Sequence, residues 1–190
     1  MAFRPVVRQA IKYASPEALF NDCKKRKYAG VLSHQADVLR AYQTNALDKP
    51  DVAFQMPTGS GKTLVGILLA EWRRRTFHER PLYLTPTKQL AFQVANEARE
   101  KYDIRVIPLV GKEASFSPDQ QAAWEAGDAI VVTTYNGLFN VNPAFQDPQF
   151  IIVDDAHAAE NYFATFWSLL VKKKKVRFFG QQFLLRSGLI

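Results

Sequence analysis

The sequence MPTGSGKT at residues 56–63 decides the fold, because it joins a short apolar run at 52–54 to an apolar helical stretch at 64–72. This order predicts a strand, a glycine loop and a helix, which is the context that a phosphate-binding loop requires. Gly59 and Gly61 permit backbone angles closed to other residues, so several N–H groups can converge on an anion at the positive end of the helix. We expect Lys62 to reach the β and γ phosphates and the Thr63 hydroxyl to bind Mg²⁺. The predicted nucleotide-binding residues are Pro57, Thr58, Gly59, Ser60, Gly61, Lys62 and Thr63.

A second candidate element is the apolar run FIIV at residues 150–153, which ends in Asp154 and Asp155. Such a run is typical of a strand buried on both faces of a parallel sheet. Carboxylates at the carboxyl end of that strand would lie in the crevice where open α/β sheets bind ligands. We expect Asp154 to hold Mg²⁺ directly or through water, and Asp155 to orient and deprotonate the attacking water.

MPTGSGKT followed by VDDAH resembles motifs I and II of the superfamily 2 helicases, in the DEAD/DEAH-box or DExH group. The resemblance implies a RecA-like domain that binds ATP and Mg²⁺. Met56 stands where the loop pattern has a glycine, a position that this family commonly relaxes. Asp155 stands where the family usually has glutamate, and its shorter stem favours ATP binding over turnover. The family assigns to His157 the coupling of the nucleotide site to a second domain, although a histidine bonded within the fold is an alternative.

Two further segments resemble motifs Ia and Ib, which in such helicases contact the backbone of one nucleic-acid strand. Hydroxyls and amides at a helix start can bind phosphates without reading bases. Taken alone, Thr-Pro-Thr before a helix is also an ordinary N-cap. The predicted nucleic-acid contacts are Pro86, Thr87, Lys88, Gln89, Thr133, Thr134 and Tyr135.

The same family has an adenine-sensing glutamine at the start of the helix before the first strand. A side-chain amide can donate and accept at once, and so match an adenine edge. Gln35 leaves room for a full helix before Asp51, whereas Gln43 does not, so Gln35 is the better candidate. The alternative is a solvated glutamine on an amphipathic helix. His34 and His78 have no carboxylate or cysteine at metal-ligand spacing and are interpreted as ordinary polar positions.

Composition sets the remaining bounds. A chain of 190 residues with 47% hydrophobic residues is suited to one α/β domain, and no apolar stretch approaches the ~18 residues that a membrane span needs. Cys23 is the only cysteine, so a disulfide framework is excluded and a soluble, intracellular, cytoplasmic location is expected. The net charge of +7 lies in the two ends, while residues 31–170 are net acidic, so charge supports polynucleotide binding only weakly.

Residues 1–30 form a basic N-terminal extension that is predicted to be helical. Ser15 would be the N-cap and Pro16 would lie in the first turn. The basic residues 24–27 would lie at the negative helix end, with Gly30 as terminator. An organellar targeting sequence is the alternative interpretation.

The rest of the chain alternates between strands and helices, which predicts a parallel sheet covered on both faces and hence an α/β, RecA-like P-loop fold. Trp72, Trp124 and Trp167 fall on helical stretches and are expected to pack in the interior. The expected strands lie near residues 51–56, 81–85, 104–110, 129–134 and 149–154, and the expected helices near 61–75, 87–102, 117–126 and from about 158.

We therefore expect residues 31–170 to be the ATP-binding half of a DNA or RNA helicase, which turns over ATP poorly without a second RecA-like domain in cis or trans. The basic and aromatic tail at 171–190 does not continue the family pattern and favours a truncated product, with single-strand binding as the alternative. The competing function is a non-catalytic nucleotide-binding fragment or interaction module. A small P-loop kinase is disfavoured by the segments at 83–91 and 154–157.

Overall fold

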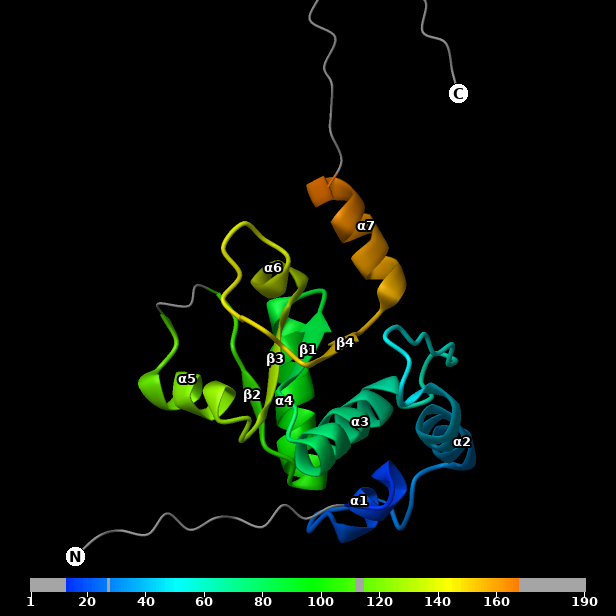
Figure 1. The fold of residues 1–190 in the computed structure, drawn as a ribbon. Helices are drawn as coiled ribbons and strands as arrows, with labels where there is room; N and C mark the ends of the chain where they lie inside the picture. The colour runs from blue at the N-terminus through cyan, green and yellow to red at the C-terminus, as the bar shows by residue number, and fades with distance from the viewer. Residues whose placement is uncertain (1–12, 27, 112–114, 168–190) are drawn as a thin grey trace, which may run out of the picture.

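Four parallel strands form the centre of the structure, in the order β2-β3-β1-β4 (Figure 1). The computed structural model describes residues 13–26, 28–111 and 115–167. Leu82 of β1 pairs with Val131 of β3 on one side and with Ile151 of β4 on the other. The strands are β1 (Pro81–Thr85), β2 (Val106–Pro108), β3 (Ile130–Thr134) and β4 (Phe150–Val153).

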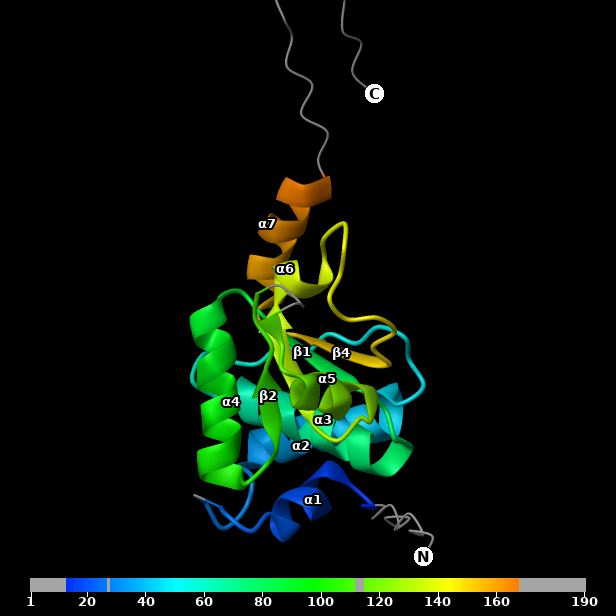
Figure 2. The ribbon, with the colours of Figure 1, turned by 90° about the vertical axis from the view of Figure 1, so that its left-hand side faces the viewer.

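Helices cover both faces of this sheet, as Figures 1 and 2 show from two sides. On one face, α3 packs against β1, β3 and β4, and α4 packs against β1, β2 and β3. On the other face lie α5 and α6, while α7 leads away from the carboxyl end of β4. The helices are α1 (Pro16–Asp22), α2 (Ser33–Ala41), α3 (Lys62–Phe77), α4 (Lys88–Tyr102), α5 (Pro118–Glu125), α6 (Tyr135–Leu138) and α7 (Ala156–Trp167), with a π-helix at Tyr42–Ala46.

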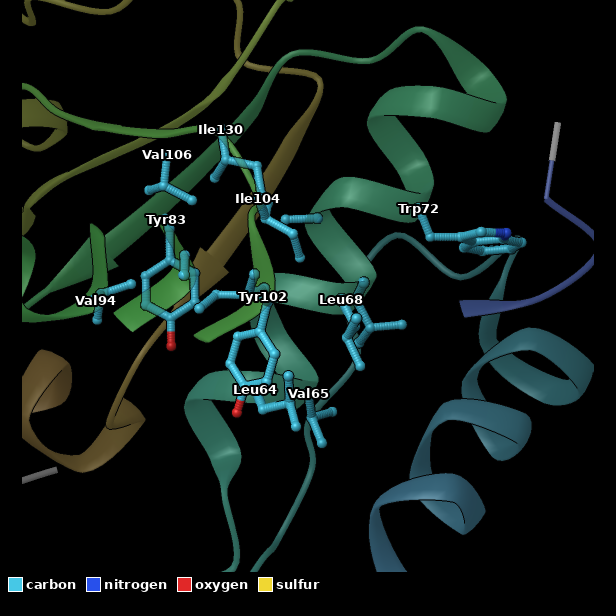
Figure 3. Packing of buried hydrophobic residues seen from close by; sticks show 14 of the residues in the cluster. Leu64, Val65, Leu68, Trp72, Tyr83, Val94, Tyr102, Ile104, Val106 and Ile130 are labelled. Carbon is cyan, nitrogen blue, oxygen red and sulfur yellow. The ribbon is translucent and has the colours of Figure 1, made fainter. Parts of the chain in front are cut away.

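The core consists of two apolar layers, one on each face of the sheet. Alternate residues along a strand point into one layer or the other. Tyr83 joins the side chains of α3 and α4 in the larger layer, whereas Leu82 and Leu84 face the smaller layer with Trp124 and Phe145. Figure 3 shows side chains of this larger layer, among them Leu64, Leu68 and Trp72 of α3, Tyr83 of β1 and Val94 and Tyr102 of α4. The expected α/β sheet with helices on both faces is confirmed, and so is the burial of Trp72 and Trp124.

Local sequence explains where several helices begin. The Ser15 and Ser117 hydroxyls accept hydrogen bonds from Ala18 and Gln120 N–H at 3.1 and 3.3 Å, and each serine precedes a proline in the first helical turn. Gly127 follows α5 with a left-handed φ of 64°. These features confirm the predicted start of α1 and both predicted ends of α5, because side-chain oxygens and left-handed glycines satisfy helix termini.

Ion pairs and hydrogen bonds around a buried glutamate connect α3 to distant parts of the chain. Glu71 is fully buried and accepts bonds from Arg74 at 2.7 and 2.8 Å and from Arg75 at 2.5 Å. Arg74 also donates to the Gly127 carbonyl at 3.1 Å, and Arg75 to the Tyr13 hydroxyl at 3.2 Å. The network therefore connects α3 to the start of the described chain and to the turn after α5.

Four expectations about elements are wrong. Residues 51–56 form no strand, and Val52 and Phe54 are exposed, so β4 is an edge strand rather than one buried on both faces. Ile151 is accordingly 41% exposed. The strand expected at 104–110 is confined to Val106–Pro108. Helix α1 ends at Asp22, so Lys24 and Gly30 lie beyond it and do not terminate it.

Residues 1–12 and 27 of the extension predicted at 1–30, and the tail predicted at 171–190, lie outside the described residues. In the part of the chain that is described, no helix combines the length and the apolar character needed to span a membrane.

Candidate functional site

The loop between residue 57 and α3 is a tight turn with two left-handed glycines. Gly59 has a φ of 78° and Gly61 a φ of 81°, and the Ser60 hydroxyl donates to the Pro57 carbonyl at 2.7 Å. A Cβ atom at Gly61 would stand 2.3 Å from Nε2 of Gln35. Gly61 is therefore required both for its backbone angle and for the close approach of Gln35.

Gln35 and His34 hold this loop from α2. Gln35 is buried, and its Nε2 donates to the Ser60 carbonyl at 2.8 Å while its Oε1 accepts from Leu32 N–H at 3.0 Å. His34 Nε2 lies 2.9 Å from the same Ser60 carbonyl. Gln35 is thus no solvated surface residue. Sequence reasoning missed the contact between His34 and Ser60. The only signal in the sequence was that His34 lies next to Gln35.

The acidic pair follows β4 at the carboxyl edge of the sheet. Asp154 is half-buried, and its N–H donates to the Leu84 carbonyl of β1 at 2.9 Å. Asp155 is exposed and has a left-handed φ of 56°. Its Oδ1 accepts from Ala158 N–H at 3.4 Å, so this carboxylate lies at the start of α7. A carboxylate here is favourable because it faces the positive end of the helix.

Tyr83 connects the loop helix to the acidic pair. Its buried hydroxyl interacts with the Asp154 carboxylate and the Thr63 hydroxyl, and its ring lies against Gly66, one turn further along α3. Burial, followed by the Asp154 charge, raises the pKa of Tyr83 well above its ordinary value. Thr63 and Asp154 therefore flank one phenol. Sequence reasoning did not identify Tyr83 as part of this site.

Lys62 is near enough for its charge to act on the pKa of Asp154. Burial raises the pKa of Asp154, and the negative charge of Asp155 raises it further. The hydrogen bond from Tyr83 and the positive charge of Lys62 act in the opposite direction. A cation at this position would lower the pKa of Asp154, because it favours the charged carboxylate.

The oxygen atoms of Thr63 and Asp154 fit the preference of Mg²⁺ for hard ligands. Among the described residues, no three histidine, cysteine or acidic side chains gather closely enough to enclose a metal ion. A Mg²⁺ ion here would therefore take its remaining ligands from phosphate and water, as this ion commonly does.

The segment predicted to resemble motif Ia lies at the turn between β1 and α4. Pro86 is half-buried, and Thr87, Lys88 and Gln89 are exposed. The Thr87 hydroxyl accepts from Leu90 N–H at 3.2 Å and caps α4. An N-cap and an exposed helix start are compatible with phosphate contacts, so the role of these residues stays a prediction.

The segment predicted to resemble motif Ib is mostly interior. Thr133 and Tyr135 are only 1% and 2% exposed, and Thr134 is half-buried. The Tyr135 hydroxyl donates to the Asp155 carbonyl at 3.0 Å and also contacts the Asp154 carbonyl. Burial and the two aspartates raise the pKa of Tyr135 to about 12. In this conformation the side chains of Thr133 and Tyr135 face the protein, so Thr134 is the residue of this segment that a ligand can reach most easily.

His157 lies in the first turn of α7 with an exposed side chain, next to the acidic pair in sequence. Its backbone carbonyl accepts from Asn161 Nδ2 at 3.5 Å. The exposed ring is compatible with the coupling role, which stays a prediction, as does the alternative of a histidine bonded within the fold.

The glycine loop, the parallel sheet and the acidic pair at its carboxyl edge are consistent with a RecA-like domain of the helicase type. A family model described as DEAD/DEAH box helicase matches residues 33–187. Because this match covers more than half of the chain, the chain belongs to the DEAD/DEAH box helicase family.

Curated relatives agree with this family. The chain is 35% identical over 124 residues to the ATP-dependent RNA helicase DDX51 of Danio rerio. This match covers 56% of this chain and 19% of that protein. It is 35% identical over 97 residues to the ATP-dependent RNA helicase SrmB of Escherichia coli K12, covering 47% of this chain and 22% of that protein. The matching SrmB of Haemophilus influenzae is 37% identical over 92 residues, covering 45% of this chain and 20% of that protein. The chain thus spans about a fifth of the length of these relatives.

Proposed function

We propose that this chain is the Mg-ATP-binding domain of an ATP-dependent RNA helicase. The observation that carries the proposal is the proximity of Asp154 to both Thr63, through Tyr83, and the charge of Lys62, because a magnesium-bound triphosphate needs a hydroxyl, an ammonium group and a carboxylate together. RNA is favoured over DNA because the relatives are named as RNA helicases.

Each residue of the site has a proposed part. The loop amides at 57–61 and the start of α3 bind the phosphates, and Lys62 neutralises the β and γ phosphates. Thr63 and Asp154 hold Mg²⁺, whose charge would stabilise the developing negative charge on the phosphates. Asp155 orients the attacking water and accepts its proton.

Two regions extend the site. Gln35 keeps one amide hydrogen and one lone-pair position beyond its bonds to Ser60 and Leu32, so it can still meet an adenine edge. Thr87, Lys88, Gln89 and Thr134 form the proposed contacts to the RNA backbone. His157 faces the proposed second RecA-like domain, from which an arginine would raise the rate by about 10³- to 10⁵-fold.

The Lys62→Ala variant tests nucleotide binding. Loss of the ammonium group should abolish binding of a fluorescent ATP analogue in the presence of Mg²⁺, while the circular dichroism spectrum stays unchanged. Lys49→Ala, which removes an exposed lysine from the segment before the loop, is the matched control and should bind as the unaltered chain does. Equal nucleotide affinity in the Lys62→Ala and Lys49→Ala variants would overturn the proposal.

A non-catalytic nucleotide-binding module is the second candidate function. It is favoured by one observation, the hydrogen bond from Ala158 N–H to the Asp155 carboxylate, which engages at the start of α7 the group that would orient the attacking water. The two candidates are separated by ATP turnover with single-stranded RNA and an added second RecA-like domain. Turnover that Asp155→Ala removes, with Mg-ATP still bound, supports the helicase, and its absence under all these conditions supports the binding module.

A further inference from the structure

Tyr135 reaches across the sheet to the turn that carries the acidic pair. It follows β3 directly, whereas Asp154 and Asp155 follow β4, and β1 lies between these two strands. Its hydroxyl donates to the Asp155 carbonyl at 3.0 Å and contacts the Asp154 carbonyl. One side chain therefore joins segments from two strands that are not neighbours.

The ring of Tyr135 is fixed as firmly as its hydroxyl. It is 2% exposed, and its centroid lies 5.7 Å from that of Tyr162 and 6.2 Å from that of Phe163, both on α7. Because α7 begins immediately after Asp155, the ring packs against the helix that follows the acidic turn, while the hydroxyl contacts the turn itself. A movement of residues 134–135 would therefore be transmitted to this turn through packed atoms.

The turn itself is a conformation that needs support. Asp155 has a φ of 56°, a region that non-glycine residues occupy at a cost. Its carbonyl accepts from Ala159 N–H at 3.1 Å as well as from Tyr135. The carbonyls of the peptide groups before and after Asp155 are thus both contacted by one hydroxyl. The direction of the Asp155 carboxylate depends on this peptide.

We propose that Tyr135 is a positioning residue that couples RNA contacts at Thr134 to the orientation of the Asp154–Asp155 turn, and so to nucleotide binding. The inference rests on the proposed function. In this proposal Tyr135 acts through the acidic turn and does not itself bind either ligand. Because its hydroxyl bonds to the acidic turn, a shift of residues 134–135 would change the conformation of that turn.

The test is the Tyr135→Phe variant, which keeps the ring and removes only the hydroxyl. The affinity of a fluorescent ATP analogue with Mg²⁺ is measured without RNA and with a saturating labelled oligouridine, and melting temperatures are recorded alongside. In the unaltered chain RNA should raise nucleotide affinity about 5-fold or more, a usual size for coupling between two sites. In the variant this factor should fall toward 1, while each ligand binds alone within about twofold of its normal affinity.

Tyr102→Phe is the matched control, because it removes a hydroxyl from another buried tyrosine, on α4, and should keep the coupling. Coupling that persists in Tyr135→Phe overturns the inference, and so does a variant that loses affinity for either ligand alone. If the unaltered chain binds both ligands without coupling, the inference fails but the proposed function stands. If the unaltered chain binds no nucleotide, the proposed function fails first.

Discussion

At the residue scale, the backbone conformation and the N-cap bond of Asp155 explain why this chain has aspartate where the related helicase motif usually has glutamate. Its φ of 56° lies in the left-handed region, which aspartate and asparagine enter more readily than other side chains do. Its Oδ1 also accepts from Ala158 N–H, which is an N-cap geometry that the shorter acid suits. The shorter stem thus fits the local backbone.

The Asp155→Glu variant should therefore be less stable. A longer acid loses the N-cap bond and fits the left-handed conformation less well, so we expect a loss of about 1 kcal/mol in the free energy of unfolding. Asp155→Asn, which keeps both properties, should lose much less. Urea denaturation of the two variants measures the difference, and a glutamate variant as stable as the asparagine variant would contradict the explanation.

Residues that act through local sequence were predictable, and those that act through distant contacts were not. The left-handed angles of Gly59 and Gly61 follow from the loop pattern. The place of Tyr83 between Thr63 and Asp154 exists only because β1 pairs with β4. The same holds for Tyr135, which sequence reasoning assigned to a nucleic-acid contact and whose side chain faces the acidic turn. No spacing in the sequence encodes either neighbour.

At the scale of the element, the position of α3 on the sheet depends on the absence of a side chain at Gly66. A Cβ atom there would stand 2.8 Å from Cε2 of Tyr83, a ring that is 1% exposed and cannot swing away. Alanine would gain about 1 kcal/mol of helix propensity, but overpacking a buried contact costs about 1–3 kcal/mol. Packing and propensity therefore oppose each other at this position.

We expect packing to prevail, so the Gly66→Ala variant should be destabilised by about 1 kcal/mol. Thermal and urea unfolding measure the change. Gly30→Ala is the matched control, because a Cβ atom at Gly30 would have nothing within 4 Å. A Gly66→Ala variant that equals or exceeds the unaltered chain in stability would mean that Tyr83 does not fix the distance between α3 and β1.

Helices and strands were predictable where one local sequence signal, such as an apolar run or a capping residue, was strong. The apolar runs of β1 and β3 and the serine-proline starts of α1 and α5 required no tertiary information. Residues 51–56 have the same apolar character as a strand but pair with no neighbour within the described sheet. Since a strand depends on its partner as much as on its own residues, composition alone overstated this segment.

At the scale of the whole molecule, a few buried charges connect parts that are far apart in sequence. The Glu71 carboxylate is 0% exposed and is bonded by Arg74 and Arg75, which in turn reach Gly127 and Tyr13. Trp72 donates to the Tyr13 carbonyl at 2.9 Å and adds a second connection. The N-terminal part of the described chain therefore contacts α3 near Trp72 and Arg75 through polar as well as apolar interactions.

Replacing Glu71 by glutamine should be among the most destabilising single changes in this domain. The substitution keeps the shape but leaves two arginines without a buried counter-charge, and breaking such a pair costs about 3–5 kcal/mol. Asp37→Asn is the control, since the Asp37 side chain is 72% exposed and its ion pair with Arg40 should contribute no more than about 1 kcal/mol. Urea titrations followed by tryptophan fluorescence report both changes, because Trp72 adjoins Glu71 on α3. Similar losses in the two variants would mean that the buried network does not hold α3 to Gly127 and Tyr13.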